Sequence, residues 1–379
     1  MRKPGAAGAL GAAGALGAAG ALGAAGALGA AGAAGAISVP RRLVVLAPNW
    51  LGDAVMALPL LRDLRRAWTS TEIVVAARPA VEPLFSMVPA VDGTIVLDGG
   101  GGRAVIRSAR TNTARLAEGR FDAALLLPNS FAAAWLVRRA GVGERWGYAR
   151  DLRGRLLTRA VRRLRHFGHQ VEYYQALGTA LGIAAGSPHA AIVVPDHARA
   201  AATRLLEQRG VAYDHPFVVF APGAAYGRAK QWPPERFAEL AQMLATGSVT
   251  TVLVGSKDDM GACQEISRLA AVTDLAGRTD LPTLAAVLSQ ARAVVSNDSG
   301  AMHLAAAAGA PVTAVFGPTN ERRTAPLAAS AVAPQPTIVA TGVWCRPCML
   351  RECPIDHRCM TRITAARVLD ALRVLDAPL

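Results

Sequence analysis

Short apolar runs alternate with helical patterns along most of this chain, and this alternation constrains its fold more than any other feature. Buried-strand patterns and helical spacing alternate in the first half, with strands at 43–47, 73–76 and 123–127 and helices at 54–68, 131–140 and 171–182. Strands that alternate with helices predict a parallel sheet with helices packed on its faces. We therefore predict an α/β fold.

The same alternation starts again after Pro195 and Asp196. Its predicted strands are 217–221, 250–254, 293–296 and 312–316, with helices from Pro234, near Gly261, near Pro282 and at 301–308. Two doubly wound halves leave a cleft at the carboxyl ends of their strands, where ligands bind in such sheets. We predict one Rossmann-like domain at 41–195 and a second at 196–379.

The first forty residues have a different composition. Glycine occupies every third position from Gly5 to Gly35, but the tract lacks the proline of a collagen helix. It is too long and too rich in glycine for a signal peptide, and so much glycine also disfavours a transmembrane helix. We predict that 1–40 is a disordered low-complexity tail, and that the folded part is soluble because no other segment approaches eighteen uninterrupted apolar residues.

Positive charge is concentrated in one part of the sequence. The chain carries a net charge of +14. Only two acids, Glu144 and Asp151, accompany ten arginines at positions 138, 139, 145, 150, 153, 155, 159, 162, 163 and 165. Such a patch suits an anionic partner, either nucleic acid or a phosphorylated lipid at a membrane surface. Aromatic residues are sparse there, which disfavours a single-strand binder, and the alternative is a solvated surface.

The segment 296–317 has the pattern of a phosphate site. An apolar run ends in Ser296-Asn297-Asp298-Ser299-Gly300, which supplies capping side chains and a glycine before a short helix. A helix N-terminus after a buried strand directs unpaired N–H groups and a partial positive charge at one point, where a pyrophosphate binds. His303, one turn into the helix, could reach the same anion. The alternative is a well-capped connection without a ligand.

Two earlier loops also follow predicted strands. In the first, 47–53, Asp53 could act as a general base towards a hydroxyl, or could simply cap the helix that follows. In the second, 222–233, Gly223 lets the backbone approach a ligand while Arg228 and Lys230 offer positive charge. This loop is not a Walker A motif, because no Ser or Thr follows Lys230.

A further loop, 255–259, together with Glu265, could hold a ribose. Taken in order, these loops resemble the ADP-heptose:lipopolysaccharide heptosyltransferases, and within them the heptosyltransferase II branch. The similarity covers about residues 42–375 and is carried by the motifs Asn-Trp-Leu-Gly-Asp-Ala-Val-Met at 49–56, Pro-Gly through Lys-Gln-Trp-Pro at 222–233, Asp-Leu-Ala-Gly at 274–277 and Ser-Asn-Asp-Ser-Gly-Ala-Met-His at 296–303.

The resemblance implies a GT-B glycosyltransferase fold, with the acceptor in the N-terminal half and the nucleotide sugar in the C-terminal half. It implies inverting transfer of L-glycero-D-manno-heptose from ADP-heptose to the first heptose of the lipopolysaccharide inner core. Asp53 matches the family's catalytic base and Lys230 its phosphate-binding lysine. The remaining residues expected to bind the nucleotide or substrate are Gly52, Gly223, Arg228, Glu265, Asp298, Ser299, Gly300 and His303.

The resemblance also gives expectations about partners and location. The arginine-rich patch would face the Kdo carboxylates and lipid A phosphates of the acceptor, and the protein would be cytoplasmic and peripheral at the cytoplasmic face of the inner membrane, held there by electrostatics. No cofactor and no nucleic-acid partner is expected. A lysine and a helix N-terminus stabilise departing ADP without a metal ion, and the sequence contains no Asp-x-Asp motif.

Four cysteines near the C-terminus allow a different interpretation. Cys345, Cys348, Cys353 and Cys359, with His357 between them, have the spacing C-x2-C-x4-C-x5-C. Four soft ligands so close together could bind zinc or an iron–sulfur cluster, although the two separated pairs of a zinc ribbon are missing. The alternative is a set of reduced thiols in a cytosolic loop.

Three rival functions remain open at this level. One is heptosyltransferase I, which acts on Kdo2-lipid A, and another is a sugar-nucleotide epimerase of the same architecture. The third is a non-catalytic protein that binds nucleic acid through its arginines, whose affinity would fall steeply with salt. The sequence does not specify the oligomeric state.

Overall fold

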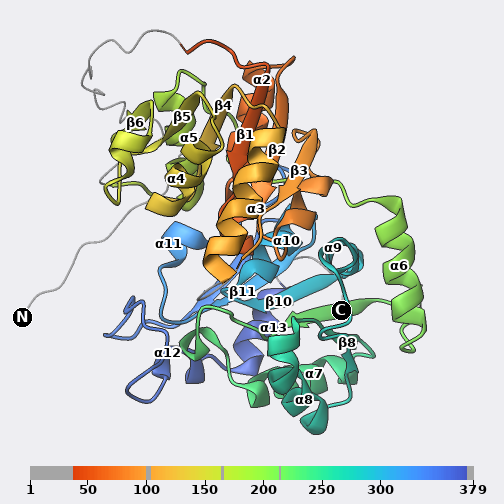
Figure 1. Cartoon of the computed structure of the whole chain (residues 1–379). Coiled ribbons are helices and arrows are strands. Elements are labelled where there is room, and N and C mark those ends of the chain that lie inside the picture. The colour runs from red at the N-terminus through yellow and green to blue at the C-terminus, as the bar shows by residue number, and fades with distance from the viewer. Residues whose placement is uncertain (1–36, 100–103, 164–165, 213–214, 374–379) are drawn as a thin grey trace, which may run out of the picture. The chain divides into compact units, whose positions relative to one another are not determined.

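Two six-stranded parallel sheets form the framework of the protein (Figure 1). The computed structural model of the chain describes residues 37–99, 104–163, 166–212 and 215–373. Residues 1–36 of the predicted tail, and Arg165 of the arginine-rich stretch, lie outside the described residues. In Figure 1 the strands of the first sheet are coloured red to yellow-green, and those of the second green to blue.

The first sheet has the strand order β3-β2-β1-β4-β5-β6. Its strands are β1 (Arg42–Leu46), β2 (Glu72–Ala77), β3 (Gly93–Val96), β4 (Ala123–Leu126), β5 (Glu144–Tyr148) and β6 (Arg159–Val161). The central strand β1 pairs in parallel with β2 and β4, with Val45 opposite Val75 on one side and Leu125 on the other. These side chains are fully buried, as expected for a parallel sheet covered on both faces.

The second sheet has the order β12-β11-β10-β7-β8-β9. Its strands are β7 (Phe217–Ala221), β8 (Thr250–Leu253), β9 (Thr273–Asp274), β10 (Ala293–Asn297), β11 (Val312–Phe316) and β12 (Thr337–Ala340). Numbered from β7 as its first strand and read from β9 to β12, this sheet has the order 3-2-1-4-5-6, which is also the order of the first sheet. Each sheet is therefore doubly wound, which confirms the predicted α/β fold class.

This topology determines where a ligand site can form. The strand order reverses between β1 and β4 in the first sheet and between β7 and β10 in the second. Ligands of doubly wound sheets bind outside the carboxyl ends of the strands at this reversal. The connections that follow β1, β7 and β10 carry Asp53, Lys230 and Asp298, respectively.

Helices and short 3-10 helices connect the strands. They are α1 (Leu51–Met56), α2 (Leu58–Ala67), η1 (Glu82–Met87), α3 (Ala104–Glu118), α4 (Phe131–Arg139), η2 (Arg153–Leu156), α5 (Gln170–Ala180), α6 (Asp196–Glu207), η3 (Arg228–Lys230), α7 (Pro234–Thr246), η4 (Lys257–Asp259), α8 (Met260–Leu269), α9 (Leu281–Gln290), α10 (Gly300–Ala307), α11 (Glu321–Thr324), α12 (Arg358–Thr361) and α13 (Ala365–Arg373).

The single helix predicted at 54–68 is wrong in one respect. The structure has two helices there, α1 and α2, which meet at Ala57. Pro59 lies in the first turn of α2 and has no N–H to donate to the carbonyl four residues earlier, so one continuous helix would lack a hydrogen bond at this point. The break limits α1 to six residues, and Asp53 lies at its third position.

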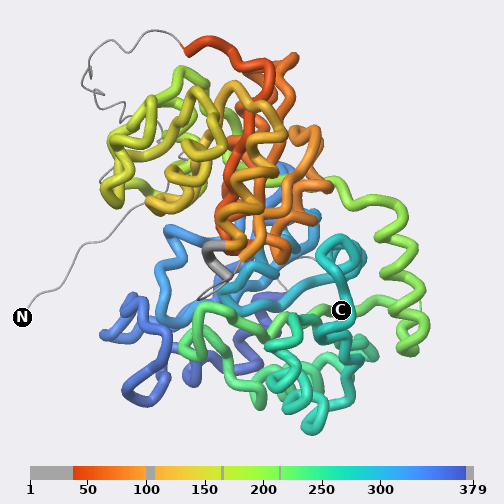
Figure 2. The backbone as a smooth tube through the Cα atoms, in the orientation of Figure 1, coloured from red at the N-terminus to blue at the C-terminus, as the bar shows by residue number. Residues whose placement is uncertain are grey.

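The two sheets lie on either side of the predicted domain boundary at 195/196, and α6 follows that boundary, coloured green in Figure 2. Residues 37–379 form one compact unit, and one cluster of buried apolar side chains contains both Val45 of β1 and Val219 of β7. The division into two domains therefore stays a prediction. Among the described residues, no helix is long and apolar enough to cross a membrane.

Candidate functional site

Asp53 lies in the first turn of α1, directly after the loop that follows β1. The N-cap position of this helix is occupied by Trp50, so the interpretation of Asp53 as a capping residue is wrong. The hydroxyl of Tyr174 donates a hydrogen bond of 3.3 Å to Asp53 Oδ1. Burial raises the pKa of Asp53, the Tyr174 bond and the positive charge of Lys230 lower it, and Asp298 raises it, with a net increase.

Lys230 ends the short helix η3 in the loop after β7. Its Nζ lies 2.7 Å from Asp298 Oδ2 and 4.9 Å from the centre of the Tyr226 ring. The Lys230 side chain is 14% exposed and that of Asp298 5% exposed, so the ion pair is largely shielded from water. The Thr319 hydroxyl donates a hydrogen bond to the same Asp298 oxygen. A cation and a carboxylate are therefore held together at the end of β10.

The turn between β10 and α10 differs from the sequence prediction in its capping. Ser299 is the N-cap residue, with extended backbone, but its side chain makes no capping hydrogen bond. Its hydroxyl lies 3.2 Å from that of Ser296 instead. The expected capping side chains were therefore wrong, because Ser299 directs its oxygen back towards the strand. Ser299 therefore does not cap the first-turn N–H groups of α10, and such N–H groups are the donors that bind an anion at a helix N-terminus.

Helices α1 and α10 approach each other closely at two glycines. A Cβ atom on Gly52 would lie 2.9 Å from His303 Cδ2, and one on Gly300 would lie 2.8 Å from Leu51 Cβ. Both distances are shorter than a carbon contact of normal packing. The absence of side chains at these two positions therefore allows the helix that carries Asp53 to pack on the helix that follows Asp298.

His303 is buried in this contact, with 5% of its surface exposed. Burial lowers its pKa to about 4, outweighing the opposite effect of Asp298. The imidazole is therefore neutral at physiological pH, whereas an anion would be bound more strongly by a charged ring. His303 can offer a neutral hydrogen bond and a packing surface to α1.

Asn297, at the end of β10, connects the two loops of the second sheet. Its amide nitrogen donates a hydrogen bond of 2.6 Å to the carbonyl of Pro222, and its Oδ1 accepts one of 3.0 Å from the N–H of Trp232. These bonds hold both ends of the loop that contains Lys230. The side chain is fully buried, so both bonds form away from water.

The cysteine-containing segment, residues 345–359, makes hydrogen bonds to the same loop. Ala229 donates its N–H to the carbonyl of Arg351 at 2.9 Å, and its carbonyl accepts a bond of 2.7 Å from His357 Nε2. The Tyr226 hydroxyl donates to the Met349 carbonyl at 2.8 Å. A Cβ atom added to Gly227 would lie 2.4 Å from the Arg351 carbonyl oxygen, so the segment packs here because the side chain is absent. The segment therefore holds the backbone of Ala229, the residue before Lys230, at both its N–H and its carbonyl group.

The four cysteines of this segment are free thiols, Cys348 and Cys353 exposed and Cys359 buried. Burial, and to a smaller extent the neighbouring thiols, raises the pKa of Cys359 to about 11. Within the part of the chain that the structure describes, no group of three or more His, Cys, Asp or Glu side chains is arranged to hold a metal ion. The metal interpretation of the four cysteines therefore stays a prediction.

Three of the residues predicted to bind the nucleotide or substrate have other surroundings. Gly223 faces Asp259, whose carboxylate would lie 2.3 Å from an added Cβ and accepts hydrogen bonds from Ser256. Arg228 and Glu265 are exposed. The structure brings Asp53, Lys230 and Asp298 into electrostatic contact, with Gly52, Ser299, Gly300 and His303 at the adjoining ends of α1 and α10.

The arginine-rich stretch is only partly a surface patch. Arg153 is fully buried and donates hydrogen bonds to the carbonyls of Tyr148 and Pro128, so its assignment to the surface was wrong. Burial lowers the pKa of Arg153. Arg145 donates to the carbonyls of Val142, Gly143 and Leu156. Both arginines use their donors to satisfy backbone acceptors, which a composition count cannot reveal.

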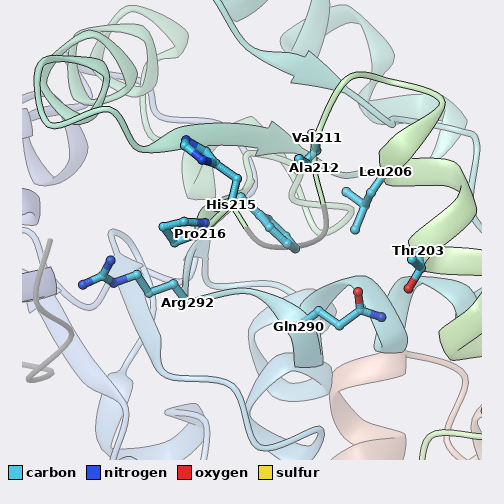
Figure 3. A pocket seen from close by; sticks show the side chains of 9 residues that line it. Thr203, Leu206, Val211, Ala212, His215, Pro216, Gln290 and Arg292 are labelled. Carbon is cyan, nitrogen blue, oxygen red and sulfur yellow. The ribbon is translucent and has the colours of Figure 1, made fainter.

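A pocket of about 370 Å³ lies away from these loops, at the start of β7 (Figure 3). Thr203 and Leu206 of α6 line one side, and Gln290 and Arg292 line another. It opens at the amino ends of β7 and β10, which is the opposite edge of the sheet from the carboxyl ends where Lys230 and Asp298 lie. The pocket therefore does not belong to the site built from the loops.

Comparison with known proteins identifies the family of the chain. The model of glycosyltransferase family 9 (heptosyltransferase) matches residues 110–358. Lipopolysaccharide heptosyltransferase 2 of Escherichia coli K12 is 34% identical over 300 residues, which cover 76% of this chain and 85% of the relative. Lipooligosaccharide heptosyltransferase 2 of Haemophilus ducreyi is 30% identical over 306 residues, which cover 77% of this chain and 87% of the relative.

Solved structures are similar as well. The structure of E. coli ADP-heptose lps heptosyltransferase II has a TM-score of 0.73 and 29% identity, and the match covers 88% of this chain and 98% of that one. A family 9 glycosyltransferase from Veillonella parvula has a TM-score of 0.78 at 22% identity, covering 90% and 98%. The two doubly wound sheets are therefore those of the GT-B fold.

Proposed function

Because the chain belongs to glycosyltransferase family 9, the heptosyltransferases, we propose that it transfers L-glycero-D-manno-heptose from ADP-heptose to the first heptose of the lipopolysaccharide inner core. The relatives named heptosyltransferase 2 support this donor and acceptor. The observation that carries the proposal is the packing of α1 on α10, which sets the Asp53 carboxylate against Lys230, Asp298 and an uncapped helix N-terminus.

Asp53 is the general base of the proposed reaction. Its carboxylate accepts the proton of the acceptor hydroxyl while that oxygen attacks the anomeric carbon from the side opposite the diphosphate, which inverts the configuration. Burial raises the pKa of Asp53, and a higher pKa makes the carboxylate a stronger base. Tyr174 orients the carboxylate through its hydrogen bond to Oδ1. Burial keeps the pKa of Tyr174 well above its ordinary value, so its hydroxyl remains a donor.

Lys230 and the N-terminus of α10 receive the departing diphosphate. The bond between the anomeric carbon and a phosphate oxygen breaks, and the leaving ADP gains negative charge. Lys230 Nζ already lies in a shielded position, and the first-turn N–H groups of α10 add a partial positive charge. Preorganised positive charge in such a site lowers the barrier to departure of an anion. Asp298 holds the lysine in place through the 2.7 Å ion pair.

The roles of the other predicted residues follow from their surroundings. Gly52 and Gly300 permit the helix contact, and we assign Ser299 and neutral His303 to the binding of the diphosphate. Gly223, Arg228 and Glu265 stay predictions for the nucleoside part of the donor. We place the enzyme in the cytoplasm and peripherally at the inner face of the inner membrane, because the proposed acceptor is a lipid carrying Kdo carboxylates and lipid A phosphates.

Mass spectrometry of the acceptor tests the reaction. Purified protein is incubated with ADP-heptose and either mono-heptosylated Kdo2-lipid A or Kdo2-lipid A without heptose. We expect one added heptose on the mono-heptosylated acceptor only. Addition to the unheptosylated acceptor alone would move the assignment to heptosyltransferase I, and consumption of ADP-heptose without a modified acceptor would favour an epimerase.

Two variants test the division of roles. Asp53→Asn keeps the size of the side chain but removes the base, so transfer should fall by several orders of magnitude while ADP affinity stays nearly unchanged. Lys230→Ala should weaken ADP binding and turnover together, since it removes the positive charge that binds the diphosphate. Isothermal titration with ADP and initial rates measure both quantities, and an equal loss of ADP affinity in the two variants would contradict the assignment.

A further inference from the structure

Helix α4 exposes one continuous stripe that contains no acidic residue. Its exposed residues recur at helical spacing, and they are Phe131, Ala132, Trp135, Arg138 and Arg139. Phe131 is 48% exposed and Trp135 is 40% exposed. The opposite side of the helix packs into the core through Ala134 and Val137, which are fully buried. The stripe is thus apolar at its N-terminal end and basic at its C-terminal end.

The loop that follows β5 adds a second apolar group. Leu152 is 93% exposed, the second highest exposure among the large apolar side chains that the structure describes. Its backbone is left-handed, with φ of 59°, a conformation disfavoured for a branched side chain. The next residues form η2, against which α4 packs. The fold therefore holds Leu152 in solvent, next to an element that α4 contacts, at a conformational cost.

Arginines surround these apolar groups. Arg150 and Arg155 flank Leu152 and are exposed. The Arg139 guanidinium lies over the Trp135 ring, 5.7 Å from its centre. Asp151 is the acid beside Leu152, and it is already paired with Arg150 at 3.3 Å. Exposed aromatic and leucine side chains amid arginines that outnumber the nearby acids are complementary to an anionic lipid surface, into whose interface the apolar groups insert.

The position of this surface connects it to the proposed acceptor site. Helix α4 begins at Phe131, two residues after Asn129, whose amide donates a hydrogen bond of 2.7 Å to the hydroxyl of Tyr173. Tyr173 adjoins Tyr174, whose hydroxyl bonds Asp53. The apolar end of the stripe therefore lies at the same carboxyl edge of the first sheet as the proposed base.

We propose that Phe131, Trp135 and Leu152, with the arginines around them, form a docking face that inserts into the surface of an anionic bilayer. This inference rests on the proposed function for its purpose, because a lipid-anchored acceptor must reach Asp53 from the membrane. Insertion at this face brings the edge of the sheet that carries Asp53 towards the headgroups. The apolar side chains supply insertion, and the arginines supply the preference for negative lipid.

Vesicle flotation with the full-length protein tests the face. Vesicles of phosphatidylcholine alone are compared with vesicles containing about one third phosphatidylglycerol. We expect binding to the anionic vesicles, and at least a tenfold lower partition for the variant that combines Phe131→Ala, Trp135→Ala and Leu152→Ser. Arg138→Gln combined with Arg139→Gln should reduce the preference for anionic vesicles. Trp344→Ala is the matched control, because Trp344 is 75% exposed elsewhere on the chain and should not alter binding.

Activity separates this proposal from the proposed function. The triple apolar variant should lose turnover on acceptor embedded in vesicles and keep wild-type turnover on a water-soluble, deacylated acceptor. Unchanged vesicle binding in that variant would overturn the docking face, as would an equal loss caused by Trp344→Ala. If the triple variant bound vesicles like the wild type but lost affinity for duplex DNA, the surface would bind nucleic acid and the docking face would also be overturned. Absence of heptose transfer to either acceptor, with vesicle binding lost only in the triple variant, would refute the proposed function and support the face.

Discussion

Gly52 offers the sharpest test of how the two helices assemble the site. In Gly52→Ala the new methyl group would lie 2.9 Å from Cδ2 of the buried His303 ring, so the ring or helix α1 must shift. Adding a methyl to a packed contact costs about 1–3 kcal/mol. Alanine returns about 0.5–1 kcal/mol through its higher helix propensity. We therefore expect a net loss of up to about 2.5 kcal/mol in the free energy of unfolding.

Activity should fall as well as stability. Asp53 is the next residue, and a shift of α1 moves its carboxylate relative to Lys230. A misplacement of about 1 Å costs on the order of a hundredfold in rate, so a shift of a few tenths of an ångström should lower kcat about tenfold. Urea unfolding and initial rates with saturating ADP-heptose measure the two effects.

Gly261 provides a matched control. It is also the second residue of its helix, and an added Cβ would have no neighbour within 4 Å. Gly261→Ala should therefore raise stability by about 0.5–1 kcal/mol and leave kcat unchanged. If Gly52→Ala proves as stable and as active as Gly261→Ala, the close contact of α1 with α10 does not position the base.

Three further predictions follow from the same site. Tyr174→Phe removes the bond that lowers the pKa of Asp53, so the acid limb of kcat/KM should move to higher pH, and an unmoved limb would contradict the role of this hydroxyl. The pKa of His303 falls from 6.5 to about 4 on folding. Its contribution of roughly 3 kcal/mol to the free energy of unfolding is therefore present above pH 6.5 and is lost as pH falls towards 4. In urea unfolding, His303→Gln should show a smaller difference in stability between pH 4.5 and pH 6.5 than the wild type does. His357→Ala removes the bond to the Ala229 carbonyl and should raise KM for ADP-heptose severalfold, whereas His215→Ala, which removes a similar bond to the Ser248 carbonyl, should not.

The predictable parts of the fold are those whose signal is local. Strands β7 and β11 have the predicted bounds, because a short apolar run between turn residues is sufficient to indicate a buried parallel strand. The strands β3 and β6 gave no such signal: each is short, lies at an edge of the sheet and is only partly buried. The break at Ala57 was missed because helical spacing continues across it, although Pro59 marks it.

The site was predictable where a loop follows a strand and not where distant residues meet. The motifs indicated Asp53, Lys230 and Asp298, and the structure brings these three together. No sequence pattern singled out Tyr174, because its bond to Asp53 joins positions 121 residues apart. Arg153 looked like surface charge because its buried acceptors are backbone carbonyls, which no side-chain pattern reports.

The contact between α1 and α10 joins segments that leave the ribosome at very different times. Gly52 is followed by about 250 residues before His303 is made, which at roughly 5–20 residues per second takes on the order of 10–50 s. During that interval the first sheet can fold, but Leu51 and the apolar cluster that continues into the second sheet lack their partners. The newly made first half therefore exposes an apolar surface at the place where α10 will later pack, and this surface is where a chaperone would bind the nascent chain.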